Sequence, residues 1–294
     1  MNHSSIIRFI NDLNENDFKD ALQLNPPQCI LSGAKFYFDS LFLAGRYNKY
    51  SRTMSQTPWV VNNVTICEES IEESISNGLK KYIKFDSLTL SASGREDVDV
   101  RMLGKGRPFL IELTNPRSAP IDEILKPIMD QFTGDIRIRD LTVVTREQAL
   151  IFLKNPEGNR KKTYEALCIL NRSLKPEEYE KIENSKSFKI IQSTPLRVMH
   201  RRTVADRSRT IHEMKAFPVN KADLESEFSE FQKHCYRMIK LNVITDAGTY
   251  IKEFVHSDFG RTNPSLINFL EEDAQVDILS LDVVEVNYDW PTPL

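Results

Sequence analysis

Apolar and polar positions alternate along the chain with two different periods, which predicts both helices and strands. In Ser70–Tyr82 and Ala119–Phe132 the apolar residues recur every three or four positions, as on one side of a helix. In Ile136–Thr145, Thr163–Leu170 and Ile278–Tyr288 the alternation is typical of strands. These elements follow one another without a regular β–α–β rhythm. The pattern therefore predicts an α+β fold with a mixed, mostly antiparallel sheet flanked by helices and loops.

The first part of the chain is predicted to form a separate appendage. Residues 1–28 contain a short helical pattern of apolar positions, and this pattern stops at Asn25-Pro26-Pro27. A residue that precedes proline is disfavoured in a helix, so the two prolines mark a break. We therefore predict an N-terminal appendage over residues 1–28 and one main domain over residues 29–294.

Composition and cysteine spacing limit the class of protein. The chain has 294 residues, and 40% of them are hydrophobic, which is enough to bury a core. No run of about 18 apolar residues occurs, so no membrane span is expected. The first residues lack the features of a secretory signal, which favours an intracellular protein of the nucleus, the cytoplasm or both. The four cysteines form no Cys-x-x-Cys pair, so neither a zinc site nor a disulfide framework is indicated.

Positive charge is concentrated locally, although the net charge is only −3. The basic stretch Arg197–Lys215 holds six lysines or arginines and two histidines against one aspartate and one glutamate. Charge runs are usually solvated faces, but guanidinium groups also match phosphate oxygens. We expect this stretch to form an RNA cradle, with four arginines as contacts: Arg197, Arg201, Arg202 and Arg207.

A second basic segment, Gly45–Arg52, mixes arginines and a lysine with tyrosines. Such a composition suits phosphates and stacked bases. The alternative is an exposed loop that tucks its aromatic residues into the core. We expect RNA contact here.

The chemistry is expected in the stretch Ser91–Leu113. A glycine, two arginines and three carboxylates lie within eight residues of it: Gly94, Arg95, Glu96, Asp97, Asp99 and Arg101. Gly94 can adopt a positive φ angle. Residues 97–101 alternate charged residues with valines, so we predict a short strand that buries one face and lines a cleft with the other.

The string Gly94-Arg95-x-Asp97 resembles the catalytic loop of pseudouridine synthases, and SGREDVDVRMLGKGRPF resembles the Pus10 group of tRNA pseudouridine synthases in particular. The resemblance covers Cys29–Pro291. It implies a pseudouridine synthase catalytic domain over residues 29–294 that needs no cofactor or metal. The implied reaction converts uridine to pseudouridine in the TΨC arm of tRNA, at position 54, position 55 or both. Members of this group usually carry an N-terminal THUMP-containing region and paired cysteines for zinc, which this sequence lacks, so a separate protein is a candidate source of such an RNA-binding domain.

The resemblance also implies roles for individual residues. Asp97 is the catalytic carboxylate, and whether it acts as a nucleophile toward C1′ or as a base toward C2′ stays open. Tyr164, within Lys162-Thr163-Tyr164, stacks on the target base. Lys252, within the string Gly248 to Phe254, pairs with the carboxylate and keeps it ionised. Three further residues are implied to contact the substrate: Arg95, Ile251 and Leu279.

Two other functions fit parts of the sequence. One is a non-catalytic RNA-binding protein on the same scaffold. The other is a metal-dependent nuclease, in which Asp97 or Asp99 and Glu112 would hold Mg²⁺. The string Glu112-Leu113-Thr114 lacks the lysine expected two residues after the glutamate of a common nuclease pattern, and the histidines show no ligand spacing, so the nuclease is disfavoured.

Overall fold

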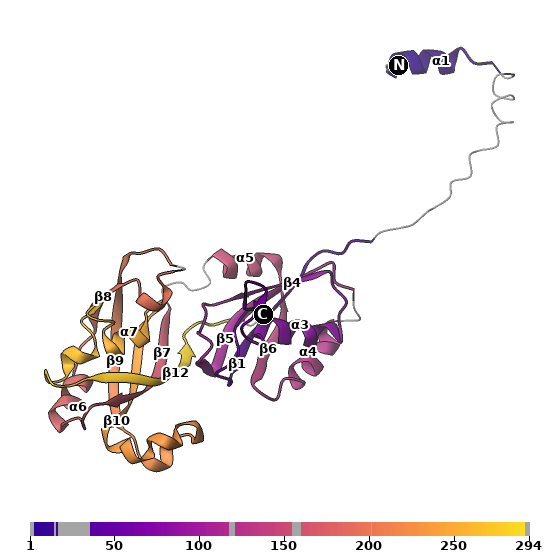
Figure 1. Ribbon diagram of the computed structural model, residues 1–294. Coiled ribbons are helices and arrows are strands. Elements are labelled where there is room, and N and C mark those ends of the chain that lie inside the picture. Colours follow the sequence, from indigo (N-terminus) through magenta and orange to yellow (C-terminus); the bar gives the residue numbers. More distant parts are fainter. Residues whose placement is uncertain are drawn as a thin grey trace. The chain divides into compact units, whose positions relative to one another are not determined.

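The computed structural model describes residues 3–14, 16, 36–117, 121–154, 160–200 and 202–291. The chain divides into two units, residues 1–37 and residues 38–294. The first unit contains the helix α1 (His3–Asn11) (Figure 1). This helix exposes the apolar side chains of Ile7, Phe9 and Ile10. Residues 17–28, where we expected the appendage to end, lie outside the described residues.

The second unit is built on one mixed sheet. Among its described residues, the strand order is β11-β8-β9-β10-β7-β12-β5-β1-β6, and β4 also pairs with β5. The strands of this sheet are β1 (Leu41–Lys49), β4 (Ser87–Ala92), β5 (Val100–Thr114), β6 (Ile136–Val144), β7 (Lys161–Leu170), β8 (Phe188–Ser193), β9 (Asp206–Pro218), β10 (Met238–Asp246), β11 (Thr262–Asn263) and β12 (Val276–Val286). A separate hairpin is formed by β2 (Val60–Val61) and β3 (Val64–Thr65).

Helices pack on this sheet and connect its strands. They are α3 (Ile71–Lys80), α4 (Ile121–Asp130), α5 (Arg146–Lys154), α6 (Pro176–Glu183) and α7 (Ile251–His256), with 3₁₀ segments η1 (Leu196–Val198), η2 (Lys221–Asp223), η3 (Ser226–Arg237) and η4 (Leu266–Phe269). All pairings in the sheet are antiparallel except that of β12 with β5. The predicted α+β fold with a mixed, mostly antiparallel sheet is confirmed.

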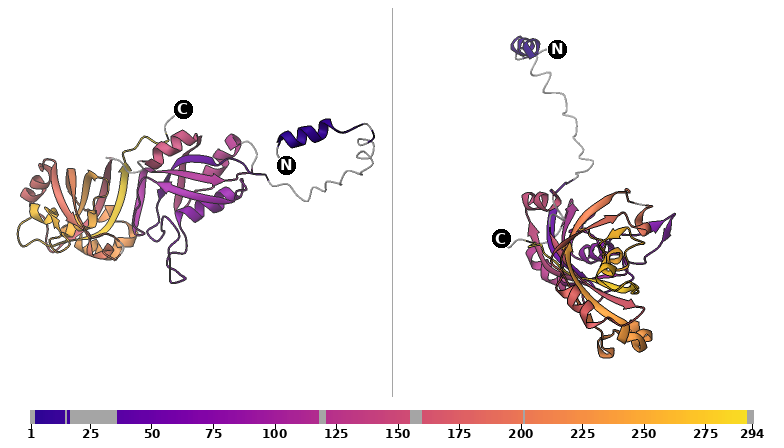
Figure 2. Two further views of the ribbon diagram at one scale, coloured as in Figure 1. Left: turned by 90° about the horizontal axis from the view of Figure 1, so that it is seen from above. Right: turned by 90° about the vertical axis from the view of Figure 1, so that its left-hand side faces the viewer.

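The parallel pair β12–β5 joins two halves of the sheet, which Figures 1 and 2 show as an orange-to-yellow half and a purple half. Three residue pairs form this junction, beginning with Leu281 opposite Val100. Residues 93–99, between β4 and β5, lead directly into Val100. The expected catalytic loop is therefore held at the junction between the two halves of the sheet.

The helix α3 shows how the sequence sets the bounds of an element. The Oγ atom of Ser70 accepts a hydrogen bond from the backbone N–H of Glu73 at 3.2 Å, which satisfies one of the unpaired donors at the helix start. The predicted apolar face is buried against the core through Ile71, Ile75 and Leu79. The prediction of a helix in this segment is confirmed, and capping explains why it begins at Ile71.

The segment Gly45–Arg52 does not form the RNA-binding loop that we expected. Most of it belongs to β1, a central strand, and the side chains of Arg46, Tyr47 and Lys49 are buried. Burial is tolerated because each polar group has partners. The guanidinium of Arg46, for example, donates to the carbonyl oxygens of Lys105, Tyr288 and Trp290 at 3.0, 2.7 and 2.9 Å. The basic and aromatic composition therefore serves the interior of the fold.

Candidate active site

The loop of residues 93–99 is fixed by side chains that donate hydrogen bonds to its backbone carbonyls. Lys49 Nζ donates to the carbonyls of Asp97 and Val98 at 3.1 and 2.8 Å. Gln56 Nε2 donates to Gly94 at 3.0 Å, and Arg107 Nη1 donates to Ser93 at 2.6 Å. Gly94 has a φ of 84°, in agreement with the predicted positive φ. The loop thus has one defined backbone conformation.

Glu96 lies beneath the loop in a buried ion pair. Its Oε2 accepts a hydrogen bond from Arg107 Nε at 2.7 Å, and its Oε1 accepts one from the Tyr47 hydroxyl at 2.9 Å. Burial raises the pKa of Tyr47 well above its usual value, so the hydroxyl stays protonated and can donate. Glu96 therefore holds the loop, and its side chain is 0% exposed.

Asp97 points the other way, toward two cations. Its Oδ2 lies 2.7 Å from Arg197 Nη1 and 3.7 Å from Lys252 Nζ. Lys252 makes its shorter contact with Asp99, at 2.6 Å. Burial acts to raise the pKa of Asp99, but the hydrogen bond and the charge of Lys252 outweigh it, so that this pKa is lowered. The predicted neighbours Asp97 and Lys252 are brought together, yet Arg197 is the nearer partner of the carboxylate.

Arg197 is itself held by a buried carboxylate. Its Nε donates to Glu253 Oε1 at 2.6 Å, and the side chain of Glu253 is only 2% exposed. Burial acts to lower the pKa of Arg197, but the bonds to Glu253 and Asp97 raise it overall. The guanidinium thus stays charged and spans two acidic groups. The side chain of Asp97 remains 34% exposed, so one part of it is open to a ligand.

A cavity of about 480 Å³, which we call the Asp97 pocket, opens beside this group. One wall is apolar and includes the 8%-exposed ring of Tyr164 on β7. The lining also includes several basic side chains. The lining residues are Arg95, Glu96, Asp97, Val100, Arg107, Lys162, Tyr164, Arg197, Val198, Arg202, Arg207, Arg209, Gly248, Thr249, Tyr250, Ile251, Lys252, Leu281 and Val283. An aromatic face, a carboxylate and several cations therefore surround one space.

Leu279 is not among the described residues that line the pocket. Arg201 lies outside the described residues. Leu279 packs instead against Val219, Cys235 and Met238, and Leu281 lines the pocket. The pairing of β12 with β7 shifts between Ile278 and Ser280, so Leu279 is the extra residue of a β-bulge. A bulge reverses which side chains face the pocket, and sequence periodicity does not show where it occurs.

The basic stretch contributes to the pocket in several ways. Arg207 Nη1 donates to Thr194 Oγ1 and to the Ala205 carbonyl at 2.9 and 3.1 Å, so Arg207 mainly holds its own segment together. Arg209 stands two positions further along β9 and also lines the pocket, which same-face alternation along a strand could have indicated. Gly248, with a φ of 75°, leaves room for it, because a Cβ there would lie 3.3 Å from the Arg209 guanidinium.

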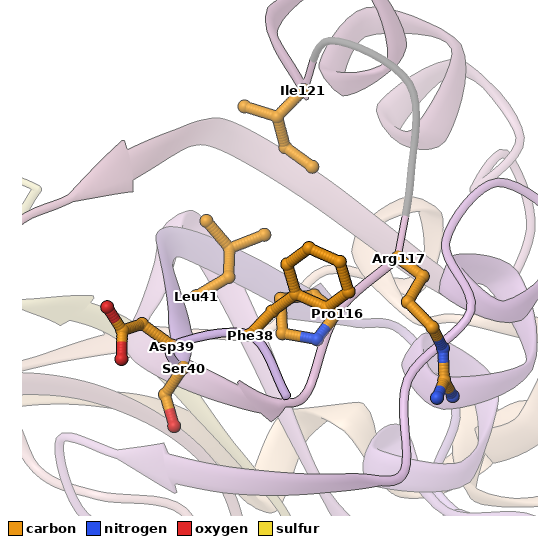
Figure 3. A pocket seen from close by; sticks show the side chains of 7 residues that line it. All are labelled: Phe38, Asp39, Ser40, Leu41, Pro116, Arg117 and Ile121. Atoms are coloured by element: carbon orange, nitrogen blue, oxygen red, sulfur yellow. The ribbon is translucent and has the colours of Figure 1, made fainter. Parts of the chain in front are cut away.

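A second cavity, of about 520 Å³, lies at the start of β1 (Figure 3). It is lined by Phe38, Asp39, Ser40, Leu41, Pro116, Arg117 and Ile121. Figure 3 shows that its two charged side chains, Asp39 and Arg117, lie on opposite sides and do not converge. Among its described lining residues, this cavity has one carboxylate and one cation that lie apart, whereas the Asp97 pocket has several cations around its carboxylate.

The described parts of the chain contain no group of three or more His, Cys, Asp or Glu side chains that could hold a metal ion. Asp97 and Asp99 are engaged by Arg197 and Lys252, and Glu112 lies within the pairing of β5 with β1 and β4. The nuclease hypothesis required these carboxylates to converge, and the arrangement gives it no support. In the same described ranges, no helix is long and apolar enough to cross a membrane.

Comparison with known proteins identifies the family. The family "Pus10, C-terminal" matches residues 42–287. The chain belongs to the Pus10 family. The tRNA pseudouridine synthase Pus10 of Homo sapiens is 41% identical over 99% of this chain and 53% of its own length. That of Pyrococcus furiosus is 35% identical over 84% of this chain and 57% of its own length. The chain therefore spans about half the length of the curated Pus10 relatives that it matches.

Solved structures give a weaker likeness. A chain of a Cbf5-Nop10-Gar1 complex matches with a TM-score of 0.41 and 13% identity, over 82% of this Pus10-family chain and 48% of that chain. This likeness carries no argument about the site. The resemblance to Pus10, which we first identified from the loop string, is confirmed by the family match and the relatives.

Proposed function

We propose that this Pus10-family chain catalyses the isomerisation of uridine to pseudouridine in tRNA. The observation that carries the proposal is the Asp97 carboxylate, which is partly exposed in a pocket between Arg197, Lys252 and the ring of Tyr164. The names of the relatives, tRNA pseudouridine synthase Pus10, support it. The proposed positions are 54, 55 or both, in the TΨC arm.

The isomerisation needs few protein groups beyond the carboxylate, the two cations and the aromatic ring of this pocket. The bond between N1 and C1′ breaks, the base turns, and C5 joins C1′; C5 loses a proton and N1 gains one, so no redox partner is needed. Asp97 acts either as a nucleophile toward C1′ or as a base toward C2′. Arg197 and Lys252 place two positive charges beside it, at 2.7 and 3.7 Å from its Oδ2.

The remaining predicted residues bind the substrate in this proposal. The target uridine leaves its stack to reach the pocket, and the ring of Tyr164 gives it a new stacking surface. Ile251 and Leu281 supply the apolar wall, and Leu281 takes the part that we first expected of Leu279. Arg95 and Arg202 are exposed at the pocket and are available to the phosphates.

The direct test is pseudouridine mapping on tRNA transcripts incubated with the purified chain in EDTA. We expect pseudouridine at 54, 55 or both and no loss of activity on metal removal, since the mechanism draws on side chains alone. Intact transcripts without any pseudouridine would support the non-catalytic RNA-binding protein. Strand cleavage in Mg²⁺ that disappears in Asp97→Asn and Glu112→Gln would support the nuclease.

The pocket arginines are expected to bind phosphate. Each contact to single- or double-stranded nucleic acid contributes about 0.7–0.9 to the slope of log affinity against log salt concentration. Arg202→Ala and Arg209→Ala are therefore each expected to flatten this slope for tRNA by about that amount. Lys126→Ala, an exposed lysine on α4 away from the pocket, is the matched control. If the salt dependence of tRNA affinity flattens equally in all three variants, the pocket arginines have no specific role in phosphate binding.

Two further parts of the proposal concern the setting of the protein. We propose an intracellular location, in the nucleus, the cytoplasm or both, and an RNA-binding domain of the THUMP type, supplied by a separate chain, that adds discrimination between tRNA sites. The family resemblance supports the second of these parts. Fluorescence microscopy of the tagged protein tests the first, and site mapping with and without the added domain tests the second.

A further inference from the structure

An aromatic ring is presented to solvent directly after α7, at a distance from the Asp97 pocket. Ser257, Asp258 and Phe259 have φ angles of 66, 52 and 57°, so three successive residues other than glycine are left-handed. The side chain of Phe259 is 93% exposed. Left-handed backbone is unfavourable for a bulky residue, and it persists only where the surrounding structure imposes it.

The left-handed conformation of this loop is fixed by contacts with the segment that carries Arg197. Asp258 is buried, and its Oδ2 accepts a hydrogen bond from the backbone N–H of Leu196 at 3.2 Å. Arg261 Nη2 donates to the carbonyl of Thr194 at 2.7 Å. The backbone that carries the exposed ring of Phe259 is therefore anchored on both sides, by Asp258 and Arg261.

A cavity of about 700 Å³, which we call the distal pocket, lies beside this ring. It is lined by Ile169, Leu170, Asn171, Arg237, His256, Ser257, Phe259, Gln275, Val276 and Asp277. Among the described residues, Arg237 Nε is buried and has no hydrogen-bond partner. The pocket thus combines a flat aromatic surface, a cation with an unsatisfied donor, and exposed amide side chains of Asn171 and Gln275.

The two pockets are lined by different residues of the same two elements, α7 and β12. Along α7, Ile251 and Lys252 line the Asp97 pocket, whereas His256 lines the distal pocket. Along β12, Leu281 lines the first and Asp277 the second. Four residues of a strand span about 13 Å, so one RNA molecule can reach both pockets.

We propose that the distal pocket binds an unpaired nucleotide of the same RNA that delivers the target uridine. The base stacks on Phe259, and Arg237 binds an adjacent phosphate. An aromatic face with a guanidinium is the combination that binds single-stranded nucleic acid, whereas the polar rim of Asn171, Gln275 and Asp277 is unsuited to an apolar protein anchor. The inference rests on the proposed function only in taking RNA as the ligand.

Binding measurements with tRNA test the proposal. Loss of one base stack is worth about 1–3 kcal/mol, which is about a 5- to 150-fold loss of affinity, and we expect a loss in this range for Phe259→Ala. Phe259→Trp is expected to keep wild-type affinity. Arg237→Met is expected to flatten the salt slope by about 0.7. Tyr236→Ala is the matched control, because Tyr236 is a neighbouring exposed aromatic that does not line the pocket.

Crosslinking identifies the occupant. A photoreactive phenylalanine analogue at position 259 is expected to crosslink to an unpaired nucleotide of bound tRNA. Crosslinks to paired nucleotides alone, or wild-type affinity in Phe259→Ala with an unchanged melting temperature, would overturn the proposal, and so would a crosslink to protein alone. Pseudouridine formation by the wild type is measured in parallel. If the wild type forms pseudouridine and Phe259→Ala binds tRNA normally, only this inference is contradicted. If the wild type forms no pseudouridine and Phe259→Ala binds tRNA more weakly, only the proposed function is contradicted.

Discussion

Asp97→Asn is expected to lower pseudouridine formation by at least about 10⁴-fold, the upper end of what a positioned acid–base group contributes. The amide keeps the shape of the carboxylate, but it can neither attack C1′ nor take a proton from C2′. The backbone carbonyl of Asp97 is held by Lys49, and the substitution leaves this contact in place. Affinity for tRNA is therefore expected to stay within about threefold. Single-turnover assays at saturating protein, with filter binding, measure the two quantities separately.

Asp99→Asn is the matched control for this experiment. Asp99 stands two residues further along the same loop, and its carboxylate pairs with the same Lys252 that approaches Asp97. Its side chain is 62% exposed, and Lys252, which is 17% exposed, keeps Asp97 at 3.7 Å as a partner after the substitution. We expect less than about a tenfold loss for Asp99→Asn. Equal losses in the two variants would indicate that the loop needs its negative charge without a special role for Asp97.

Local strings in the sequence could predict the residues that form the centre of the site. A characteristic string marks each of three segments: the loop around Asp97, the strand around Tyr164, and the start of α7 at Ile251 and Lys252. The pocket brings all four residues together. Short-range signals suffice here because each string encodes its own element, and the sheet then aligns the elements.

The ion pairs around Asp97 could not be predicted in the same way. Arg197 lies 100 positions from Asp97 in the sequence, within a basic stretch whose composition suggested phosphate binding. Its pairing with Asp97 and Glu253 depends on the path of the connection between the adjacent strands β8 and β9, which carries Arg197. The prediction that Tyr47 and Lys49 contact RNA was wrong for a related reason. Buried polar segments and RNA-binding segments can contain the same types of residue. Only the partners, such as Glu96 for Tyr47, distinguish the two cases.

Arg197→Met is expected to reduce the rate constant of isomerisation by about 10²–10³-fold, the usual effect of removing one preorganised electrostatic partner from an active site. The reason is the 2.7 Å contact between Arg197 and Asp97, which is shorter than the 3.7 Å separation between Lys252 and Asp97. Lys252→Met is also expected to reduce the rate constant of isomerisation, but by a smaller factor than Arg197→Met. Arg197→Lys is expected to recover part of the rate, because one ammonium cannot bridge Asp97 and Glu253 as the planar guanidinium does.

A stability effect must be separated from this loss of rate. Without Arg197, Glu253 becomes a buried carboxylate with its main partner removed, and breaking such a pair destabilises a fold by up to about 3–5 kcal/mol. The double variant Arg197→Met with Glu253→Gln removes the buried charge together with the cation. We expect its melting temperature to recover toward the wild type while its rate stays low, because Asp97 still lacks its nearest cation. Recovery of both the melting temperature and the rate would show that Arg197 acts only through the fold, and would leave Lys252 as the cation that serves Asp97.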